Sequence, residues 1–195
     1  GRIRRMGPAQ EVVEEYMKRS LTDLEGSQPT LKAMFFPEQP VGDEFAQITS
    51  VELFADGIKS TGVVKMGQAI RVRVAFIVPN AADRILIPNL HVRTQDGAYV
   101  FVVMPPNSQA RNLSSGGYVA ECDIPAQFLN NGIFTVQAVI SSYTHGPVAH
   151  ANVPDALIFQ VSDDFSDVSY RNGYMQEIGG VVRPRFQWRI DEVRN

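Results

Sequence analysis

Ile70-Arg-Val-Arg-Val-Ala-Phe-Ile-Val78 is the stretch of this chain in which apolar residues alternate most regularly with the residues between them. Successive side chains of a β-strand point to opposite faces, so one face of this stretch is apolar and the other carries Arg71 and Arg73. Pro79-Asn80 then ends the pattern. The stretch predicts a strand with one face in a core and one in solvent.

Similar short segments, separated by turn signals, occupy the chain between residues 47 and 162. Turns are indicated by Asp56-Gly57, Gln95-Asp96-Gly97 and Asn131-Gly132. Pro88 predicts that the segment containing it is an edge strand or has a bulge. The other strand-like segments are 48–53, 85–94, 99–104, 118–124, 133–141 and 156–161. About seven strands on this scale predict an all-β, immunoglobulin-like β-sandwich.

The two ends of the chain differ from this central region. Residues 8–24 have apolar residues at helical spacing, which predicts one amphipathic helix within an N-terminal segment 1–26. Residues 27–46 form a linker whose aromatic residues indicate that it packs against something. After the β-sandwich domain 47–162, residues 163–195 begin as an acidic loop and end strand-like. An apolar terminal strand without a neighbour favours exchange between two chains.

Composition excludes several classes of protein. The 195 residues include 18 basic and 21 acidic side chains, and the net charge of −3 argues against a nucleic-acid partner. The longest apolar run, 98–104, is far shorter than the roughly 20 residues that span a bilayer, so direct membrane insertion is not expected. The single cysteine, Cys122, fits a reducing compartment.

Motifs of catalysis or metal binding are weak in this sequence. No phosphate-binding loop of the GxxxxGK[ST] kind occurs, so ATP hydrolysis is not expected. A metal site could recruit His145, His150 and Asp155, but their spacing matches no zinc pattern, and a solvated loop is the alternative that we favour. We therefore expect no metal and no other cofactor.

Two further groups could suggest chemistry but have simpler interpretations. Cys122 lies between two acidic residues, which raise a thiol pKa, so a buried structural cysteine is expected. Asp163-Asp164 could serve acid–base chemistry, but the turn-rich context favours a solvated loop. Neither group makes the fragment an enzyme.

Polar and aromatic residues share the predicted outward faces of several strands. If Leu90 and Val92 point inward, the side chains between them point outward, and the same alternation applies to the strands at 99–104, 133–141 and 156–161. The predicted outward set is Asn89, His91, Arg93, Tyr99, Phe101, Gln137 and Gln160. Planar donors and acceptors together with rings suit sugar hydroxyls and apolar sugar faces, although any solvated sheet face carries such residues too.

Arg93 adds a second possibility to this face. A guanidinium fork binds carboxylates and phosphates in a bidentate manner, so an acidic sugar or a phosphate cap would be a suitable ligand. Arg93 and Gln137 are the residues whose truncation we expect to abolish glycan binding.

Two parts of the sequence together resemble a known family. Gly1-Arg-Ile-Arg-Arg-Met-Gly-Pro-Ala-Gln-Glu-Val-Val-Glu-Glu-Tyr16 resembles the last strand and helix of an ABC-transporter ATPase domain. The second part is formed by Ile48-Thr-Ser-Val-Glu-Leu-Phe54, Phe159-Gln-Val-Ser-Asp163 and Gly179-Gly-Val-Val-Arg-Pro-Arg-Phe-Gln-Trp188. These segments, in this order, resemble the C-terminal domain of the Wzt-type ATP-binding subunits that export O-antigen polysaccharide.

The resemblance implies a function, a location and partners. It implies a cytoplasmic carbohydrate-binding module, peripheral to the inner membrane, that recognises the capped non-reducing end of an O-antigen and couples it to export. It also implies a homodimer with exchanged C-terminal strands, and contact with a transmembrane subunit through the missing ATPase domain, whose full-length subunit would be an ATPase. The alternative is a dimerisation or interaction domain that binds no glycan. A sugar-processing enzyme would need two carboxylates about 5 to 9.5 Å apart, and the sequence offers no clear pair.

Overall fold

A computed structural model describes residues 30–80, 84–109, 112–143, 146–165 and 171–190. The predicted helix 8–24, the whole segment 1–26 and His145 lie outside these described residues. What is described is all-β: two sheets form a β-sandwich, as predicted. No helix among the described residues is long and apolar enough to cross a membrane.

The first sheet is built around strands β3 (Gln47–Ala55), β6 (Ile70–Val78) and β9 (Gly116–Ile124). Three two-residue strands pair with β3, namely β1 (Met34–Phe35), β2 (Val41–Gly42) and β4 (Ile58–Lys59). The predicted linker 27–46 therefore contributes two strands in its described part. It packs, as its aromatic residues indicated, with Phe35 against the core.

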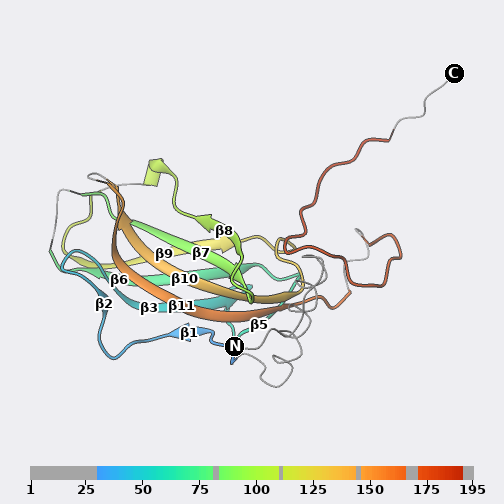
Figure 1. The fold of residues 1–195 in the computed structure, drawn as a ribbon, viewed down its shortest axis with the longest axis horizontal. Helices are drawn as coiled ribbons and strands as arrows, with labels where there is room; N and C mark the ends of the chain where they lie inside the picture. The colour runs from blue at the N-terminus through green and yellow to red at the C-terminus, as the bar shows by residue number, and fades with distance from the viewer. Residues whose placement is uncertain (1–29, 81–83, 110–111, 144–145, 166–170, 191–195) are drawn as a thin grey trace, which may run out of the picture. The chain divides into compact units, whose positions relative to one another are not determined.

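The second sheet has the strand order β5-β11-β10-β7-β8 (Figure 1). Its members are β5 (Val63–Lys65), β11 (Val148–Ser162), β10 (Gly132–Ser142), β7 (Ile87–Thr94) and β8 (Tyr99–Val103). A short 3-10 helix, η1 (Asn107–Gln109), follows β8. Within the described ranges, seven strands have five or more residues, matching the predicted number, and the four strands of two or three residues were not predicted.

The core lies between the two sheets and follows the alternation read from the sequence. Every second residue of β6, from Ile70 to Val78, is buried. Phe134 of β10 and Phe159 of β11 are fully buried, with ring centroids 5.7 Å apart. Burying a side chain of this size contributes about 1.5 to 3 kcal/mol relative to exposure. The apolar stripe of each long strand is thus what holds the sheets together.

Pro88 lies within β7, an interior strand, and not on an edge strand. β7 pairs with β10 in unbroken register from Ile87 to Thr94, and Pro88 is opposite Ile140. On its other side β7 pairs with β8 only from Leu90 onward, so Pro88 lies beyond the last of these pairs. A proline is tolerated there because its missing N–H removes no hydrogen bond to β8. The register of β7 is therefore the one that the alternation predicted.

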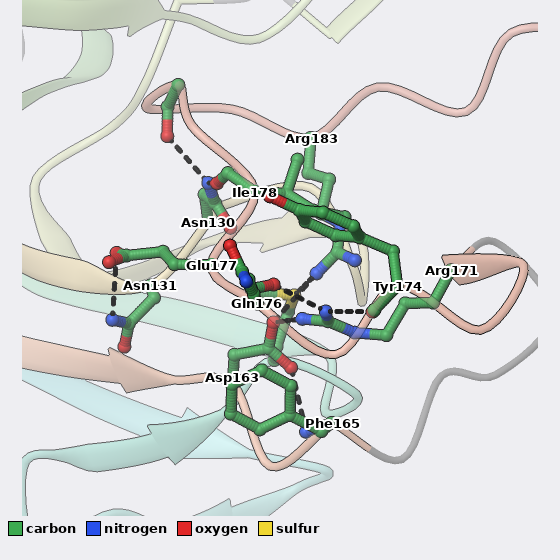
Figure 2. Close-up of polar contacts among 12 residues, drawn as sticks. Asn130, Asn131, Asp163, Phe165, Arg171, Tyr174, Gln176, Glu177, Ile178 and Arg183 are labelled. Atoms are coloured by element: carbon green, nitrogen blue, oxygen red, sulfur yellow. Dashed lines mark hydrogen bonds and ion pairs between the residues drawn. The ribbon is translucent and has the colours of Figure 1, made fainter.

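The C-terminal segment is attached to the sandwich by a partly buried ionic cluster (Figure 2). The Asp163 carboxylate accepts hydrogen bonds from Arg171 and from Arg183, the latter at 2.9 Å. Asn130 Nδ2 donates to the backbone oxygens of Ile178 and Gly180. The expected solvated acidic loop at Asp163 is wrong, because two guanidinium groups from later in the chain cover this carboxylate.

After Arg183 the chain is not a strand in the described protomer. Just before this point a bridge joins Leu129 and Val182, and Arg183 N donates a hydrogen bond to Phe128 O at 2.9 Å. Beyond them, Phe186 is 71% exposed and Trp188 is 87% exposed. The segment in which alternating aromatic residues predicted a strand therefore pairs with no strand among the described residues.

Candidate functional site

The outer face of the five-stranded sheet collects most of the predicted site residues. Leu90 and Val92 are buried in the core, which turns Asn89, His91 and Arg93 to the other face. In the register of β7 with β10, Gln137 is opposite His91 and Thr135 is opposite Arg93. The predicted proximity of the β7 residues to Gln137 is confirmed.

Arg93, Gln137 and Asn152 form a chain of hydrogen bonds across three strands. Arg93 Nη2 donates to Gln137 Oε1 at 3.1 Å, and Gln137 Nε2 donates to Asn152 Oδ1 at 2.8 Å. An Asp155 oxygen lies 3.8 Å from the same Nη2 of Arg93. A guanidinium has donors only, so it fixes the orientation of the Gln137 amide, which in turn fixes that of Asn152.

Asn89 and His91 form a second chain beside the first. Asn89 Nδ2 donates at 3.2 Å both to Ile87 O and to Ser141 Oγ, and Asn89 Oδ1 lies 3.0 Å from His91 Nε2. The backbone oxygen of Ile87 can only accept, so the Asn89 amide must turn its NH2 group toward Ile87 and its Oδ1 toward His91. Since Oδ1 is an acceptor, Nε2 of His91 carries the proton of this hydrogen bond. Burial, and then the positive charge of Arg93, lower the pKa of His91. In the neutral imidazole Nδ1 is an acceptor, and it is buried without a hydrogen-bond partner among the described residues.

Tyr99 provides the aromatic ring of this face. Its ring centroid lies 6.0 Å from that of His91 and 5.8 Å from the guanidinium carbon of Arg93, and the side chain is largely exposed. A ring held beside polar groups in this way could stack on the apolar face of a sugar. The predicted positions of Tyr99, His91 and Arg93 therefore combine into one surface.

Phe101 does not belong to this outer face, and its predicted placement is wrong. The pairing of β7 with β8 shifts register between Val92 and Arg93, so Phe101 is opposite Val92 while Tyr99 is opposite Arg93. This bulge places an extra residue between the two aromatic side chains and turns Phe101 inward. Phe101 packs against the core, with its ring 5.8 Å from that of Phe128.

Gln160 lies on the outer face but away from the two chains. It is opposite Ile133 of β10 and Val63 of β5, between the buried residues Phe159 and Val161. No hydrogen bond joins its side chain to the network among the described residues. Gln160 could only contact a ligand that extends along the sheet toward β5.

Asn152 and Asp155 are site residues that the sequence did not reveal. The pairing of β10 with β11 shifts register between Val136 and Ala138, and the extra residues of β11 include Pro154 and Asp155. Asp155 has a φ of 49°, a left-handed conformation that aspartate tolerates better than most residues. The bulge brings Asp155 to Arg93, and the only sequence signal for it was Asn-Val-Pro-Asp inside an otherwise strand-like run.

His150 is part of a buried structural contact, so the expected solvated loop is wrong here. Its Nδ1 lies 2.7 Å from Asp43 Oδ2, and its Nε2 lies 2.8 Å from Ser142 Oγ. The order Ser–His–Asp resembles a catalytic triad. However, Ser142 and His150 are both buried, so a substrate could not reach the hydroxyl. The contact links the loop before β3 to the hairpin of β10 and β11.

Two apolar cavities lie elsewhere, at the open edge of the sandwich between β8 and β9. The first has a volume of about 470 Å³ and is lined by residues including Leu86, Val103, Leu113 and Tyr118. The second, of about 290 Å³, includes Phe101 and Phe128, and Cys122 lines both. Burial and the nearby Asp123 raise the pKa of the Cys122 thiol, which fits a structural cysteine. Polar residues, among them Asn107, Gln109 and Glu121, also line the first cavity.

No group of His, Cys, Asp or Glu residues within the described ranges could hold a metal ion.

The fold and the outer face together define a β-sandwich domain with a polar, partly aromatic surface on one sheet. The family model of the Wzt C-terminal domain matches residues 38–182, and the chain belongs to this family.

The solved structures include a similar protein. The crystal structure of the C-terminal domain of Wzt is 15% identical to this chain, with a TM-score of 0.62. The similarity covers 87% of this chain and 96% of the solved one, and it supports the two-sheet fold. No curated protein matches.

Proposed function

We propose that this chain is the carbohydrate-binding module of an ABC-exporter ATP-binding subunit, and that it recognises the non-reducing end of an O-antigen polysaccharide. Membership in the Wzt C-terminal domain family supports the transporter context. The proposal of glycan binding is based mainly on one observation, the hydrogen-bonded chain Arg93–Gln137–Asn152 beside Tyr99. We further propose that the fragment has no enzymatic activity and acts on the cytoplasmic side, next to the transmembrane subunit.

The physical case for a sugar ligand rests on the kind of groups that the face offers. Sugar hydroxyls both donate and accept, so they are best met by fixed donors and acceptors together. Arg93 and Asn152 offer donors, while the exposed carboxylate of Asp155 offers acceptors. Because the orientation of each amide is set by its neighbours, little ordering remains when a ligand binds.

A homodimer is the second part of the proposal. Phe186, Trp188 and Ile190 are exposed on alternating residues, and such a strand is stable only when paired and covered. In the described part of the chain, β9 pairs with β6 on one side only, and the two apolar cavities lie beside it. The terminal segment of a second copy could pair with this edge and place its apolar side chains in the cavities.

The exposed terminal residues and the unpaired edge of β9 also fit the alternative function, a dimerisation domain that binds no glycan. Calorimetric titration with the polymer exported by the same transporter separates the two functions. We expect saturable binding by the wild-type chain and strong loss in Gln137→Ala, whose side chain holds both Arg93 and Asn152. Asp123→Asn is the control, because Asp123 is an exposed residue of the opposite sheet, paired with Arg71. A folded dimer that binds no polymer would support the alternative.

A further inference from the structure

Arg93 has a carboxylate neighbour on the outer face. Asp155 Oδ1 lies 3.8 Å from Arg93 Nη2, and this carboxylate remains 63% exposed. The same Nη2 donates to Gln137. An anionic ligand would therefore have to compete with Asp155 for the guanidinium, and it would meet the repulsion of a like charge. This geometry argues against the acidic sugar or phosphate cap that Arg93 alone suggested.

Asn152 and Asp155 present complementary groups at the β11 bulge. Asn152 Oδ1 accepts from Gln137, which leaves the Nδ2 donors of this exposed residue for a ligand. The exposed carboxylate of Asp155 has acceptors only. Both side chains reach the Arg93–Gln137 pair, one through the 2.8 Å hydrogen bond and the other at 3.8 Å. A donor and an acceptor thus flank the Arg93–Gln137 pair.

We propose that Asn152 and Asp155 form a hydroxyl-reading pair, and that the sugar unit bound here is neutral and carries adjacent free hydroxyl groups. One hydroxyl of such a unit donates to Asp155, and its neighbour accepts from Asn152 or Arg93. Arg93 serves chiefly to orient Gln137 and Asp155. This inference rests on the proposed glycan-binding function and specifies the class of its ligand.

The test uses the full chain labelled with ¹⁵N and follows the side-chain amide resonances of Asn152 and Gln137. The neutral probes are the methyl glycosides of mannose, galactose and glucose, and the anionic probes are methyl glucuronide and methyl phosphate. We expect at least one neutral glycoside to shift both resonances in a saturable manner. The anionic probes should bind at least about tenfold more weakly, or leave both resonances unchanged.

The Asp155→Asn variant separates the two ligand classes. Asparagine tolerates the left-handed backbone at this position, so the bulge is retained. We expect the affinity for the neutral glycoside to fall about tenfold or more, because a charge-assisted hydrogen bond is lost. Asp123→Asn is the matched control, since Asp123 is an exposed carboxylate paired with Arg71 on the opposite sheet. It should leave the affinity unchanged.

Two outcomes would overturn the inference, and they affect the proposed function differently. If the anionic probes bind more tightly than every neutral one and Asp155→Asn strengthens their binding, the ligand class is wrong while glycan binding stands. If no probe of either class shifts any resonance of the outer face, the hydroxyl-reading pair and the proposed function both fail.

Discussion

Replacing Asp43 should destabilise the fold by an amount that its contacts define. Asp43 Oδ1 accepts from the backbone N–H groups of Phe45 and Ala46, at 2.7 and 3.2 Å. Its Oδ2 lies 2.7 Å from Nδ1 of the buried His150. Because a carboxylate has only acceptors, Nδ1 is the donor. Asp43→Ala leaves this donor unpaired and releases two backbone groups, which should cost about 2 to 4 kcal/mol.

Asp43→Asn should cost less, about 1 to 2 kcal/mol. The amide oxygen can still accept from Phe45 and Ala46, while Nδ2 then faces His150. The imidazole can respond by accepting at Nδ1 and donating from Nε2 to Ser142 Oγ, which is 2.8 Å away. Only the charge-assisted part of the interaction is then lost. The difference between the two variants measures the cost of an unpaired buried donor.

The pH dependence provides a separate check. Burial acts to raise the pKa of Asp43, but the hydrogen bonds from His150, Phe45 and Ala46 outweigh it and hold the pKa below 3.8. A lowered pKa means that the unfolded chain binds more protons just below 3.8, so this stability is complete above that value and lost as the pH falls through the folded-state pKa. Urea unfolding of wild type and Asp43→Asn should therefore converge in acid. A constant difference between pH 7 and pH 3, or an Asp43→Ala variant as stable as wild type, would refute this reasoning.

Three further predictions concern the C-terminal segment and the thiol. Asp163→Ala leaves the largely buried guanidiniums of Arg171 and Arg183 without their shared carboxylate, so the free energy of urea unfolding should fall by about 3 to 5 kcal/mol. Proteolysis between residues 171 and 183 should become faster. Unchanged stability would show that the ionic cluster does not hold the C-terminal segment. Deleting residues 184–195 should convert a dimer to a folded monomer in light scattering, because the deletion removes the exposed side chains of Phe186, Trp188 and Ile190 that a second copy would cover. A truncated dimer would refute the exchange. Cys122 should react slowly with a thiol reagent at pH 8 until the chain is unfolded, because its pKa is raised, and a rapid reaction in the folded chain would contradict this.

The regular strands could be predicted because their apolar residues follow a single period. β6 alternates without interruption, and its buried face is the one that the sequence indicated. His91 and Arg93 were placed correctly because Leu90 and Val92 fix the inward face and the register with β10 has no bulge. Asn89, predicted to be exposed beside them, is buried. A local pattern is enough wherever the pairing is regular.

Bulges and distant partners account for what the sequence did not reveal. Phe101 was placed on the wrong face because one extra residue in β8 reverses the alternation. Asp155 was not expected on the outer face because the bulge, and not the period, brings it to Arg93. Asp163 was read as solvated because its guanidinium partners lie 8 and 20 residues further along the chain. These contacts depend on tertiary structure that a local pattern does not encode.

The most direct test of the account is to titrate the ¹⁵N-labelled chain with the polymer exported by the same transporter and to map the perturbed resonances. We expect the largest shifts on the outer face of β7, β10 and β11, at Arg93, Gln137, Asn152 and Asp155. We also expect these shifts to disappear in Gln137→Ala while the rest of the spectrum is retained. Shifts confined to the cavities between β8 and β9, or no shifts at saturating polymer, would contradict the claim that this face binds glycan.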